Sequence, residues 1–162
     1  MPQFELLLGK ENPILASIRS RGFTEPSEIQ RKAIPYVLEG RDVIAGASTG
    51  SGKTLAFAVG LVKNVKKDFG IQGLVLTPTR ELAEQIVREL THFSSAKKLH
   101  VLAIYGGVSI TNQMKQLHQT EIVVATPGRI LDHLSRHSVD LSRVNTLVLD
   151  EADRMLDMGF AP

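Results

Sequence analysis

Apolar residues follow two different spacings along the chain. Short continuous apolar runs predict strands buried on both faces of a sheet, whereas apolar residues repeated every three or four positions predict amphipathic helices. The two patterns alternate, which predicts an α/β fold with a mostly parallel sheet and helices on both faces. The expected strands are Val43 to Ala47, Leu74 to Thr77, Val101 to Tyr105, Ile122 to Thr126 and Thr146 to Asp150.

Helices are expected before the first strand and between the later ones. Asn12 and Pro13 suit the N-cap and the first position of a helix that ends at Gly22. Ser27 suits the start of a second helix. Two later apolar faces consist of Leu82, Ile86, Leu90 and Phe93, and of Ile130, Leu131 and Leu134.

The composition narrows the possible classes of protein. A chain of 162 residues with 43% hydrophobic and 22% charged residues suits one compact globular domain. A formal net charge of +2 means that affinity for a polyanion must come from local donors. Cysteine is absent, which excludes disulfides and thiolate metal sites. No apolar stretch could span a bilayer and no signal pattern begins the chain. We therefore expect localisation in the cytoplasm, or in the nucleus of a eukaryote, and no membrane partner.

The segment Ala47 to Thr54 reads A-S-T-G-S-G-K-T and has the chemistry of a phosphate-binding loop. Its glycines let backbone N–H groups turn inward around an anion, and the following helix adds its positive end. Lys53 can reach the β- and γ-phosphates, and the Thr54 hydroxyl can join the shell of Mg²⁺. A merely flexible glycine loop is the alternative, but G-K-T stands where a strand becomes a helix. The expected phosphate-binding residues are Ser48, Thr49, Gly50, Ser51, Gly52, Lys53 and Thr54.

A second motif, D-E-A-D, follows the last expected strand. Asp150 projects from the carboxyl end of that strand, where open α/β sheets place their ligands, so it is the candidate for holding Mg²⁺. Glu151 can orient the water that attacks the γ-phosphate, and Lys53 completes the expected catalytic set. The alternative is an acidic helix start that complements the helix dipole. Together the two motifs predict a nucleoside triphosphatase that uses ATP and Mg²⁺.

The ordered set of motifs resembles the DEAD-box ATP-dependent RNA helicase family over about Phe4 to Phe160. This resemblance implies a RecA-like domain that binds ATP and Mg²⁺ and, with a second such domain, grips single-stranded RNA and separates short duplexes. The motifs are G-F-T-E-P-S-E-I-Q at Gly22 to Gln30, the phosphate loop with its alanine, P-T-R-E-L-A at Pro78 to Ala83, Gly106 with Gly107, T-P-G-R at Thr126 to Arg129, and D-E-A-D.

The resemblance also assigns the adenine contacts. It places Gln30 on the adenine edge, Phe23 beside it in the same motif, and Phe4 in a stacking position on the base. A glutamine amide offers both a donor and an acceptor, as adenine requires. Two structural alternatives remain: Ser27 to Gln30 also forms a capping box, and Phe4 could pack in a core.

The resemblance places the RNA contacts at turns and helix starts after successive strands. Such contacts grip phosphates without reading bases. Arg80 could instead form an ion pair with Glu84, and Thr126 with Pro127 also suits a helix start. Gln113 lies at a family-like distance after the two glycines, although a solvated glutamine is an alternative. The implied RNA-binding residues are Pro78, Thr79, Arg80, Gly106, Gly107, Thr126, Pro127, Gly128 and Arg129, and Asp153 is implied in interdomain coupling.

Some conspicuous residues are expected to have no part in the chemistry. His133 and His137 are spaced as metal ligands on a helix could be, but the phosphate and RNA sites account for the motifs, so surface histidines are expected. Met155, Leu156 and Met158 are interpreted as packing residues.

The family's Ser-Ala-Thr strand and C-terminal RecA-like domain are absent from the chain, so residues 1–162 are expected to form an incomplete N-terminal helicase domain. The expected explanations are a piece of a longer protein, a strand from another copy, or direct pairing of Val43 to Ala47 with Thr146 to Asp150. Weak ATP binding and negligible unwinding are expected from the chain alone. The alternatives are an RNA-binding scaffold without turnover and a DNA-directed motor of the same superfamily.

Overall fold

A computed structural model describes residues 2–160. The chain divides into two compact units, where the composition predicted one. The first unit runs to Asn64 and includes His92–Lys98, and the second comprises Val65–Thr91 and the chain from Leu99 onward. None of the helices within residues 2–160 is long and apolar enough to cross a membrane.

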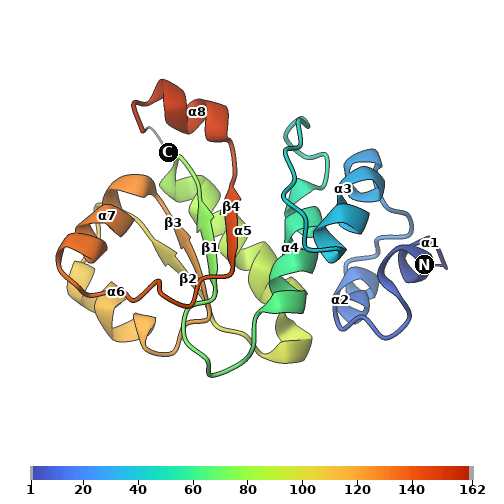
Figure 1. The fold of residues 1–162 in the computed structure, drawn as a ribbon, viewed down its shortest axis with the longest axis horizontal. Coiled ribbons are helices and arrows are strands. Elements are labelled where there is room, and N and C mark those ends of the chain that lie inside the picture. Colours follow the sequence, from blue (N-terminus) through green and yellow to red (C-terminus); the bar gives the residue numbers. More distant parts are fainter. Residues whose placement is uncertain (1, 161–162) are drawn as a thin grey trace. The chain divides into compact units, whose positions relative to one another are not determined.

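The first unit is helical. Its elements are α1 (Pro2–Leu8), α2 (Ile14–Ser20), α3 (Glu28–Leu38), α4 (Lys53–Asn64) and the 3-10 turn η1 (Ser95–Lys97), with α3 packed against α4 (Figure 1). Helix α1 was not predicted. Helix α2 begins at Ile14 with Pro13, and not Asn12, at the N-cap position, one residue later than predicted. The Asn12 Oδ1 accepts a hydrogen bond from the Ile14 N–H at 3.1 Å just before the helix.

The predicted strand from Val43 to Ala47 is wrong. These residues belong to no strand, and the side chains of Val43 and Ile44 are exposed. A parallel strand forms only where a neighbour satisfies its backbone groups, and no described segment pairs with residues 43–47. The arrangement in which this segment pairs directly with the D-E-A-D strand is therefore not the one adopted.

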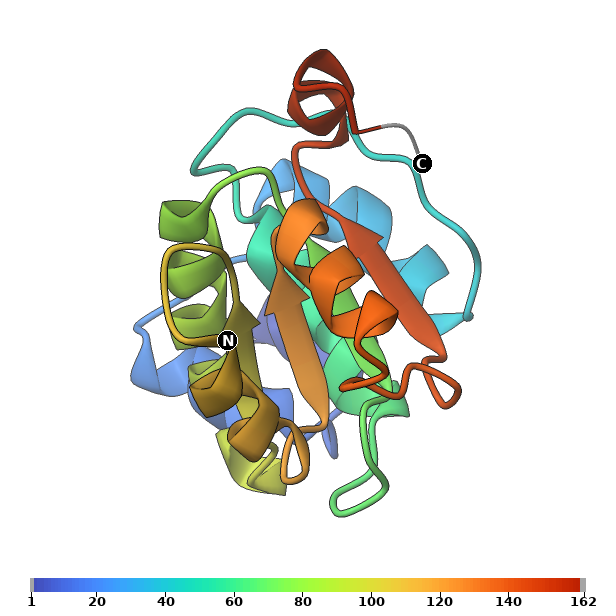
Figure 2. The ribbon, with the colours of Figure 1, turned by 90° about the vertical axis from the view of Figure 1, so that its left-hand side faces the viewer.

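The second unit is built on a parallel sheet of four strands in the order β2-β3-β1-β4 (Figure 2). All four agree with predicted strands to within a residue at each end. In the register of the sheet, Leu74 of β1 lies beside Val123 of β3 and Leu147 of β4. The strands are β1 (Gly73–Leu76), β2 (Val101–Ile104), β3 (Ile122–Ala125) and β4 (Thr146–Leu149).

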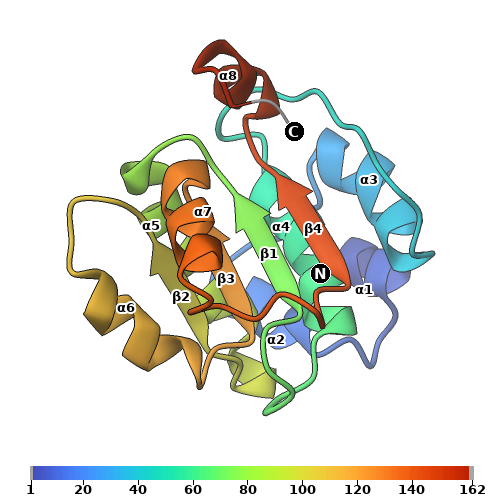
Figure 3. The same cartoon turned by 60° about the vertical axis from the view of Figure 1, so that its left-hand side comes forward.

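Helices cover both faces of this sheet, as predicted. On one face, Leu117 of α6 (Ile110–Leu117) and Ile130 of α7 (Pro127–Ser135) pack on alternate strand residues such as Val123. Helix α5 (Arg80–Phe93) lies behind the sheet in Figure 3, where α7 lies in front. Helix α8 (Ala152–Asp157) follows β4.

Burial differs among the strands. Strand β3 is buried throughout, whereas β4 alternates between half-buried and exposed residues. The exposed positions include Leu147 and Leu149, so the prediction that every strand is buried on both faces fails for β4. The described strands pair β4 with β1 alone, which makes it an edge strand of this sheet.

Candidate functional sites

The phosphate loop of the first unit joins an extended segment to α4. Gly50 and Gly52 have φ angles of 78° and 92°, the left-handed region that glycine adopts without a Cβ penalty. Lys53 is the first residue of α4, and its Nζ donates to the Ala47 carbonyl oxygen at 3.0 Å. The lysine ammonium is thus held across the loop, at the helix end where an anion is favoured.

Gln30 lies directly against this loop. The Gln30 Oε1 accepts from the Ser27 N–H at 2.9 Å, and its Nε2 donates to the Gly52 carbonyl oxygen at 3.1 Å. The first contact confirms the capping interpretation of Gln30. The second fixes the start of α3 to the phosphate loop, and the adenine contact of Gln30 stays a prediction.

Two buried hydroxyl groups lie in the same part of the first unit. The Oγ atoms of Ser27 and Ser51 have no hydrogen-bond partner among the described residues. A buried hydroxyl without a partner costs free energy, so an acceptor-rich ligand such as a nucleotide phosphate would relieve that cost. Together with the loop glycines and Lys53, these groups fit the ATP that the motif implies.

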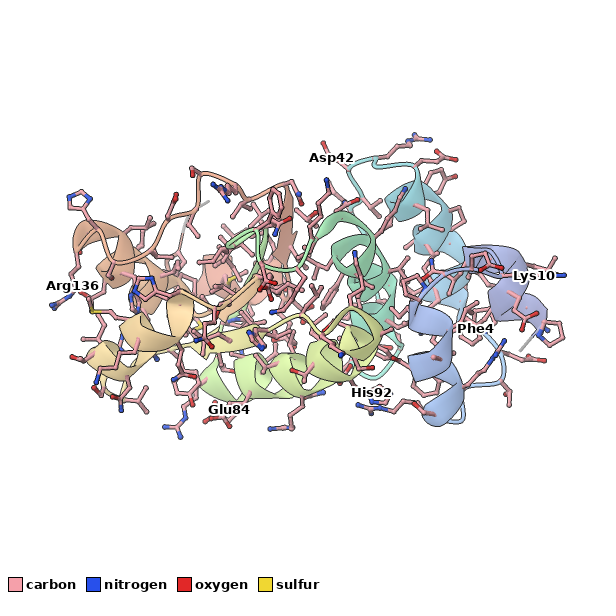
Figure 4. All side chains as sticks on the ribbon, turned by 90° about the horizontal axis from the view of Figure 1, so that it is seen from below. Phe4, Lys10, Asp42, Glu84, His92 and Arg136 are labelled. Atoms are coloured by element: carbon pink, nitrogen blue, oxygen red, sulfur yellow. The ribbon has the colours of Figure 1, made fainter. Side chains whose placement is uncertain are left out.

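The two candidate aromatic residues differ in exposure. The Phe4 side chain is 0% exposed in α1, inside the helical core of the first unit (Figure 4), whereas Phe23 is 39% exposed. A fully enclosed ring offers no face to a nucleotide base. The structure therefore favours the alternative of core packing for Phe4, and its stacking on a base stays a prediction, while Phe23 retains an accessible ring.

In the second unit, predicted site residues gather where the four strands end. Parallel strands bring their carboxyl ends to one edge of a sheet, and each end here leads into a predicted motif. Strand β1 leads to Pro78 and Thr79, β2 to Gly106, β3 to Thr126, and β4 to Asp150. Segments far apart in the sequence therefore meet at one edge of the sheet.

Arg80 begins α5 and is held by two side chains. Its Nε lies 3.7 Å from the Glu84 Oε1, which is the ion pair given as the alternative, and its guanidinium lies over the Tyr105 ring at 5.0 Å. The Tyr105 hydroxyl donates to the same Glu84 oxygen at 2.5 Å, and this hydrogen bond raises the pKa of Tyr105. About half of Arg80 remains exposed, so the guanidinium is restrained and still accessible.

Arg129 lies in the first turn of α7, after the N-cap Thr126 and Pro127. Its side chain is 13% exposed. The Nη1 donates to the Val108 carbonyl oxygen at 3.0 Å and to the Gln113 Oε1 at 3.1 Å, while Nε lies 4.0 Å from the Asp132 carboxylate. Nη2 makes no hydrogen bond to any described residue, so one amine of the guanidinium remains available.

Gln113 and His133 are buried, which excludes the alternative of a solvated glutamine and corrects the expectation of a surface histidine. Periodicity could not reveal this, because both residues are polar and each is paired with a residue distant in sequence. The Gln113 Oε1 also contacts the His133 Nε2 at 3.1 Å, and the His133 Nδ1 contacts the Ser138 Oγ at 2.8 Å. Both ring nitrogens are occupied by these contacts, which argues against a metal-ligand role for His133.

A pocket of about 340 Å³ opens at this edge of the sheet. Predicted RNA-binding residues form most of its wall, while Thr79, Arg80 and Gly107 lie outside it. Met158 and Phe160 add an apolar side that the sequence interpretation missed, because Met158 was assigned to packing and is half exposed. The lining residues are Pro78, Gly106, Thr126, Pro127, Gly128, Arg129, Asp132, Met158 and Phe160.

The D-E-A-D segment turns sharply after β4. The Asp150 N–H donates to the Leu76 carbonyl oxygen at 2.9 Å, which continues the β1–β4 ladder to the first acidic residue. Glu151 has a φ of 53°, and its carboxylate receives the Arg154 Nη1 at 3.4 Å. Asp153 lies in the first turn of α8. Left-handed backbone is uncommon outside glycine and is concentrated at functional sites.

Thr54 belongs to the first unit and Asp150 to the second, and their roles as Mg²⁺ ligands stay predictions. Among residues 2–160, no group of three or more His, Cys, Asp or Glu side chains could hold a metal ion. A threonine hydroxyl and a carboxylate are oxygen donors of the kind that Mg²⁺ takes beside nucleotide phosphates and water.

Comparisons with known proteins agree with this chemistry. The model of the DEAD/DEAH box helicase family matches residues 27–162. The ATP-dependent RNA helicase DeaD of Buchnera aphidicola subsp. Baizongia pistaciae (strain Bp) is 50% identical over 157 residues, which cover 94% of this chain and 26% of that protein.

Two solved structures are similar to the chain. A DEAD box protein from the hyperthermophile Methanococcus jannaschii matches with a TM-score of 0.89 and 46% identity, over 94% of this chain and 42% of that one. A hypothetical ATP-dependent RNA helicase from Sulfolobus tokodaii matches with a TM-score of 0.84 and 39% identity, over 93% and 44%. The chain thus spans less than half the length of each of these relatives.

Proposed function

Because the chain belongs to the DEAD/DEAH box helicase family, we propose that it is the part of an ATP-dependent RNA helicase that binds ATP with Mg²⁺ and the backbone of single-stranded RNA. The observation that carries the RNA-binding half is the edge of the second unit's sheet. There, Arg129 is pinned through Nη1 at a pocket and keeps its Nη2 available.

The nucleotide half of the proposal rests on the first unit. The loop N–H groups and the start of α4 favour phosphate, and the Lys53 ammonium adds a full positive charge there. Bound ATP would supply the γ-phosphate for hydrolysis, with Mg²⁺ neutralising its charge. Thr54 and Asp150 would contribute oxygens to the ion, and Glu151 would orient the attacking water as its proton acceptor.

The RNA half depends on donors that read no base. Helix starts at Thr79 and Thr126 direct N–H groups outward, Gly106 and Gly107 let a phosphate approach the backbone, and the arginines add charge-assisted hydrogen bonds. An ideal Cβ on Gly106 would stand 4.0 Å from Arg129 Nη2, an ordinary contact distance, so Gly106 lies beside the available amine. Binding is expected to be independent of sequence and sensitive to salt.

Unwinding is proposed only for a protein of the relatives' full length that contains these residues. The family's second RecA-like domain would supply arginine fingers, which are worth on the order of a thousandfold or more in phosphoryl transfer. Asp153 is the residue proposed to couple the two domains. We place this activity in the cytoplasm, or in the nucleus of a eukaryote.

RNA binding by the chain tests the proposal. Arg129→Ala should weaken binding of a labelled single-stranded RNA by about tenfold or more, as expected for loss of a charge-assisted hydrogen bond, and should reduce the salt slope by about 1. Arg88→Ala removes the same charge from an exposed position two turns into α5 and should change affinity little. Fluorescence anisotropy at several salt concentrations measures both quantities.

Two further experiments distinguish a lost RNA contact from other causes of weaker binding. Thermal unfolding separates a loss of RNA contact from a loss of folding, and Arg129→Lys retains the charge without the two-pronged geometry. Equal effects of Arg129→Ala and Arg88→Ala would contradict the proposed contact. Tighter binding of single-stranded DNA than of RNA of the same sequence would favour the DNA-directed motor.

A further inference from the structure

A buried histidine lies behind the pocket wall. The His133 side chain is 0% exposed, and it reaches Gln113 across α6 and α7. Burying an imidazole among polar partners is costly unless each nitrogen is paired, and both nitrogens of His133 are. Neither the nucleotide chemistry nor the RNA contacts require this residue.

The contacts of Gln113 define its orientation. Its Nε2 donates to the Tyr105 carbonyl oxygen at 3.0 Å, so its Oε1 faces the opposite side. There Oε1 lies 3.1 Å from Arg129 Nη1 and 3.1 Å from His133 Nε2. A carbonyl oxygen can only accept, so His133 Nε2 must carry the hydrogen. The Ser138 Oγ lies 2.8 Å from His133 Nδ1 and 3.1 Å from the His133 carbonyl oxygen, and in the neutral ring its one hydrogen goes to Nδ1, the nearer acceptor.

The histidine donor matters because a glutamine amide has two ends of similar shape. Rotation of the Gln113 amide by half a turn would point its NH₂ group at the guanidinium of Arg129, donor against donor. The His133 N–H disfavours that orientation as well, since it too would meet a donor. The amide oxygen is therefore kept toward Arg129 Nη1, and Nη2 makes no hydrogen bond to a described residue in a side chain that lines the pocket.

The charge of His133 is consistent with this arrangement. Burial lowers the pKa of the imidazole, Arg129 and Arg136 lower it further, and Asp132 opposes them. The neutral ring avoids a second positive charge beside the guanidinium. It also leaves the Ser138 hydroxyl hydrogen for Nδ1 at 2.8 Å.

We propose that His133 is a positioning residue for Arg129 and acts through Gln113 to hold the guanidinium at the pocket. The inference rests on the proposed RNA contact of Arg129 for its functional consequence. The positioning itself is a property of the chain without RNA, so it can be measured separately.

The test uses two substitutions with different donors. His133→Phe keeps a ring but removes the N–H, whereas His133→Gln can place an amide N–H near the position of Nε2. His133→Phe should weaken RNA binding about fivefold to tenfold, the size expected for one lost hydrogen bond, and His133→Gln should restore most of that loss. When Arg129 is already alanine, His133→Phe should cause no further loss.

Nuclear magnetic resonance of the RNA-free chain provides the independent readout. His133 should show the Nε2–H tautomer, and the guanidinium signals of Arg129 should lose their order in His133→Phe and regain it in His133→Gln. An Nδ1–H tautomer, or unchanged Arg129 signals in His133→Phe, would overturn the inference. So would an equal loss of RNA affinity from His133→Phe with and without Arg129.

Failure of the proposed function would look different. If Arg129→Ala leaves RNA affinity unchanged while the Arg129 signals respond to His133 as described, the RNA contact is wrong and the positioning is right. If His133→Phe does not fold, the tautomer of the unsubstituted chain and the His133→Gln variant still decide the matter.

Discussion

At the scale of single residues, Gly52 has the least room in the phosphate loop. A Cβ there would stand 2.3 Å from the Gln30 Nε2 and 3.1 Å from the Ser27 Oγ, and the backbone φ is +92°. Gly50 shares the left-handed backbone, with a φ of +78°, but a Cβ at that position meets nothing within 4 Å. A side chain at Gly50 would therefore cause backbone strain alone, whereas a side chain at Gly52 would cause both strain and a steric clash.

Substitution of both glycines by alanine tests this difference. Gly50→Ala should lower the free energy of unfolding by about 1–2 kcal/mol through left-handed strain alone. Gly52→Ala should cost roughly 1–3 kcal/mol more, because it also displaces the Gln30 amide from its buried hydrogen bonds. Urea denaturation gives both values, and Gln30→Ala combined with Gly52→Ala should remove the steric part. Equal losses of unfolding free energy in Gly50→Ala and Gly52→Ala would contradict the steric requirement for glycine at position 52.

The sequence predicted individual residues well where the backbone decides their role. The phosphate loop, the Ser27 start of α3 and the N-cap at Thr126 lie where their motifs placed them. The burial and orientation of single side chains were harder to predict. Phe4 is enclosed in a helical core, and the ring of His133 is buried against Gln113 and Ser138, which lie 20 and 5 residues away in the sequence. A local pattern contains no information about such distant neighbours.

At the scale of elements, helices α3 and α4 pack against each other tightly at Gly60. A Cβ on this residue would stand 2.7 Å from the Val37 Cγ1. Replacement of an interior helical glycine by alanine ordinarily stabilises the helix by up to about 1 kcal/mol. Here the added methyl group must push two packed helices apart, so packing opposes the gain in helix propensity.

We expect Gly60→Ala to destabilise the chain by about 1–3 kcal/mol, the range typical of overpacked cores. Val37→Ala in the same chain should recover most of that loss, because it removes the atom that the new methyl group meets. Denaturation of the single and double variants forms a mutant cycle that measures the coupling. Stabilisation by Gly60→Ala alone would show that the helices are not in close contact at this residue.

Prediction of the elements succeeded where apolar runs are buried by their own neighbours. The strands β1 to β4 were found to within a residue because each continuous run ends at a turn motif. The run from Val43 to Ala47 is also apolar but forms no strand. Strand formation needs a partner as well as suitable side chains, and no described segment pairs with this run.

At the scale of the whole molecule, the chemistry is divided between the two units. The phosphate loop with Lys53 belongs to the first unit, while Asp150, Glu151 and the pocket with Arg129 belong to the second. All residues of the proposed RNA-binding edge lie within the second unit. Loss of Lys53 should therefore affect nucleotide binding and leave RNA binding unchanged.

The most direct measurement is calorimetric titration of the chain with ATP in the presence of Mg²⁺, comparing Lys53→Ala with Lys10→Ala. Lys10 is exposed in the first unit, away from the loop (Figure 4). We predict Mg²⁺-dependent ATP binding that falls by about tenfold or more in Lys53→Ala, as expected for a lost charge-assisted contact to phosphate, and that is unchanged in Lys10→Ala. ATP binding of equal strength in the unsubstituted chain and Lys53→Ala would contradict the assignment of the nucleotide site.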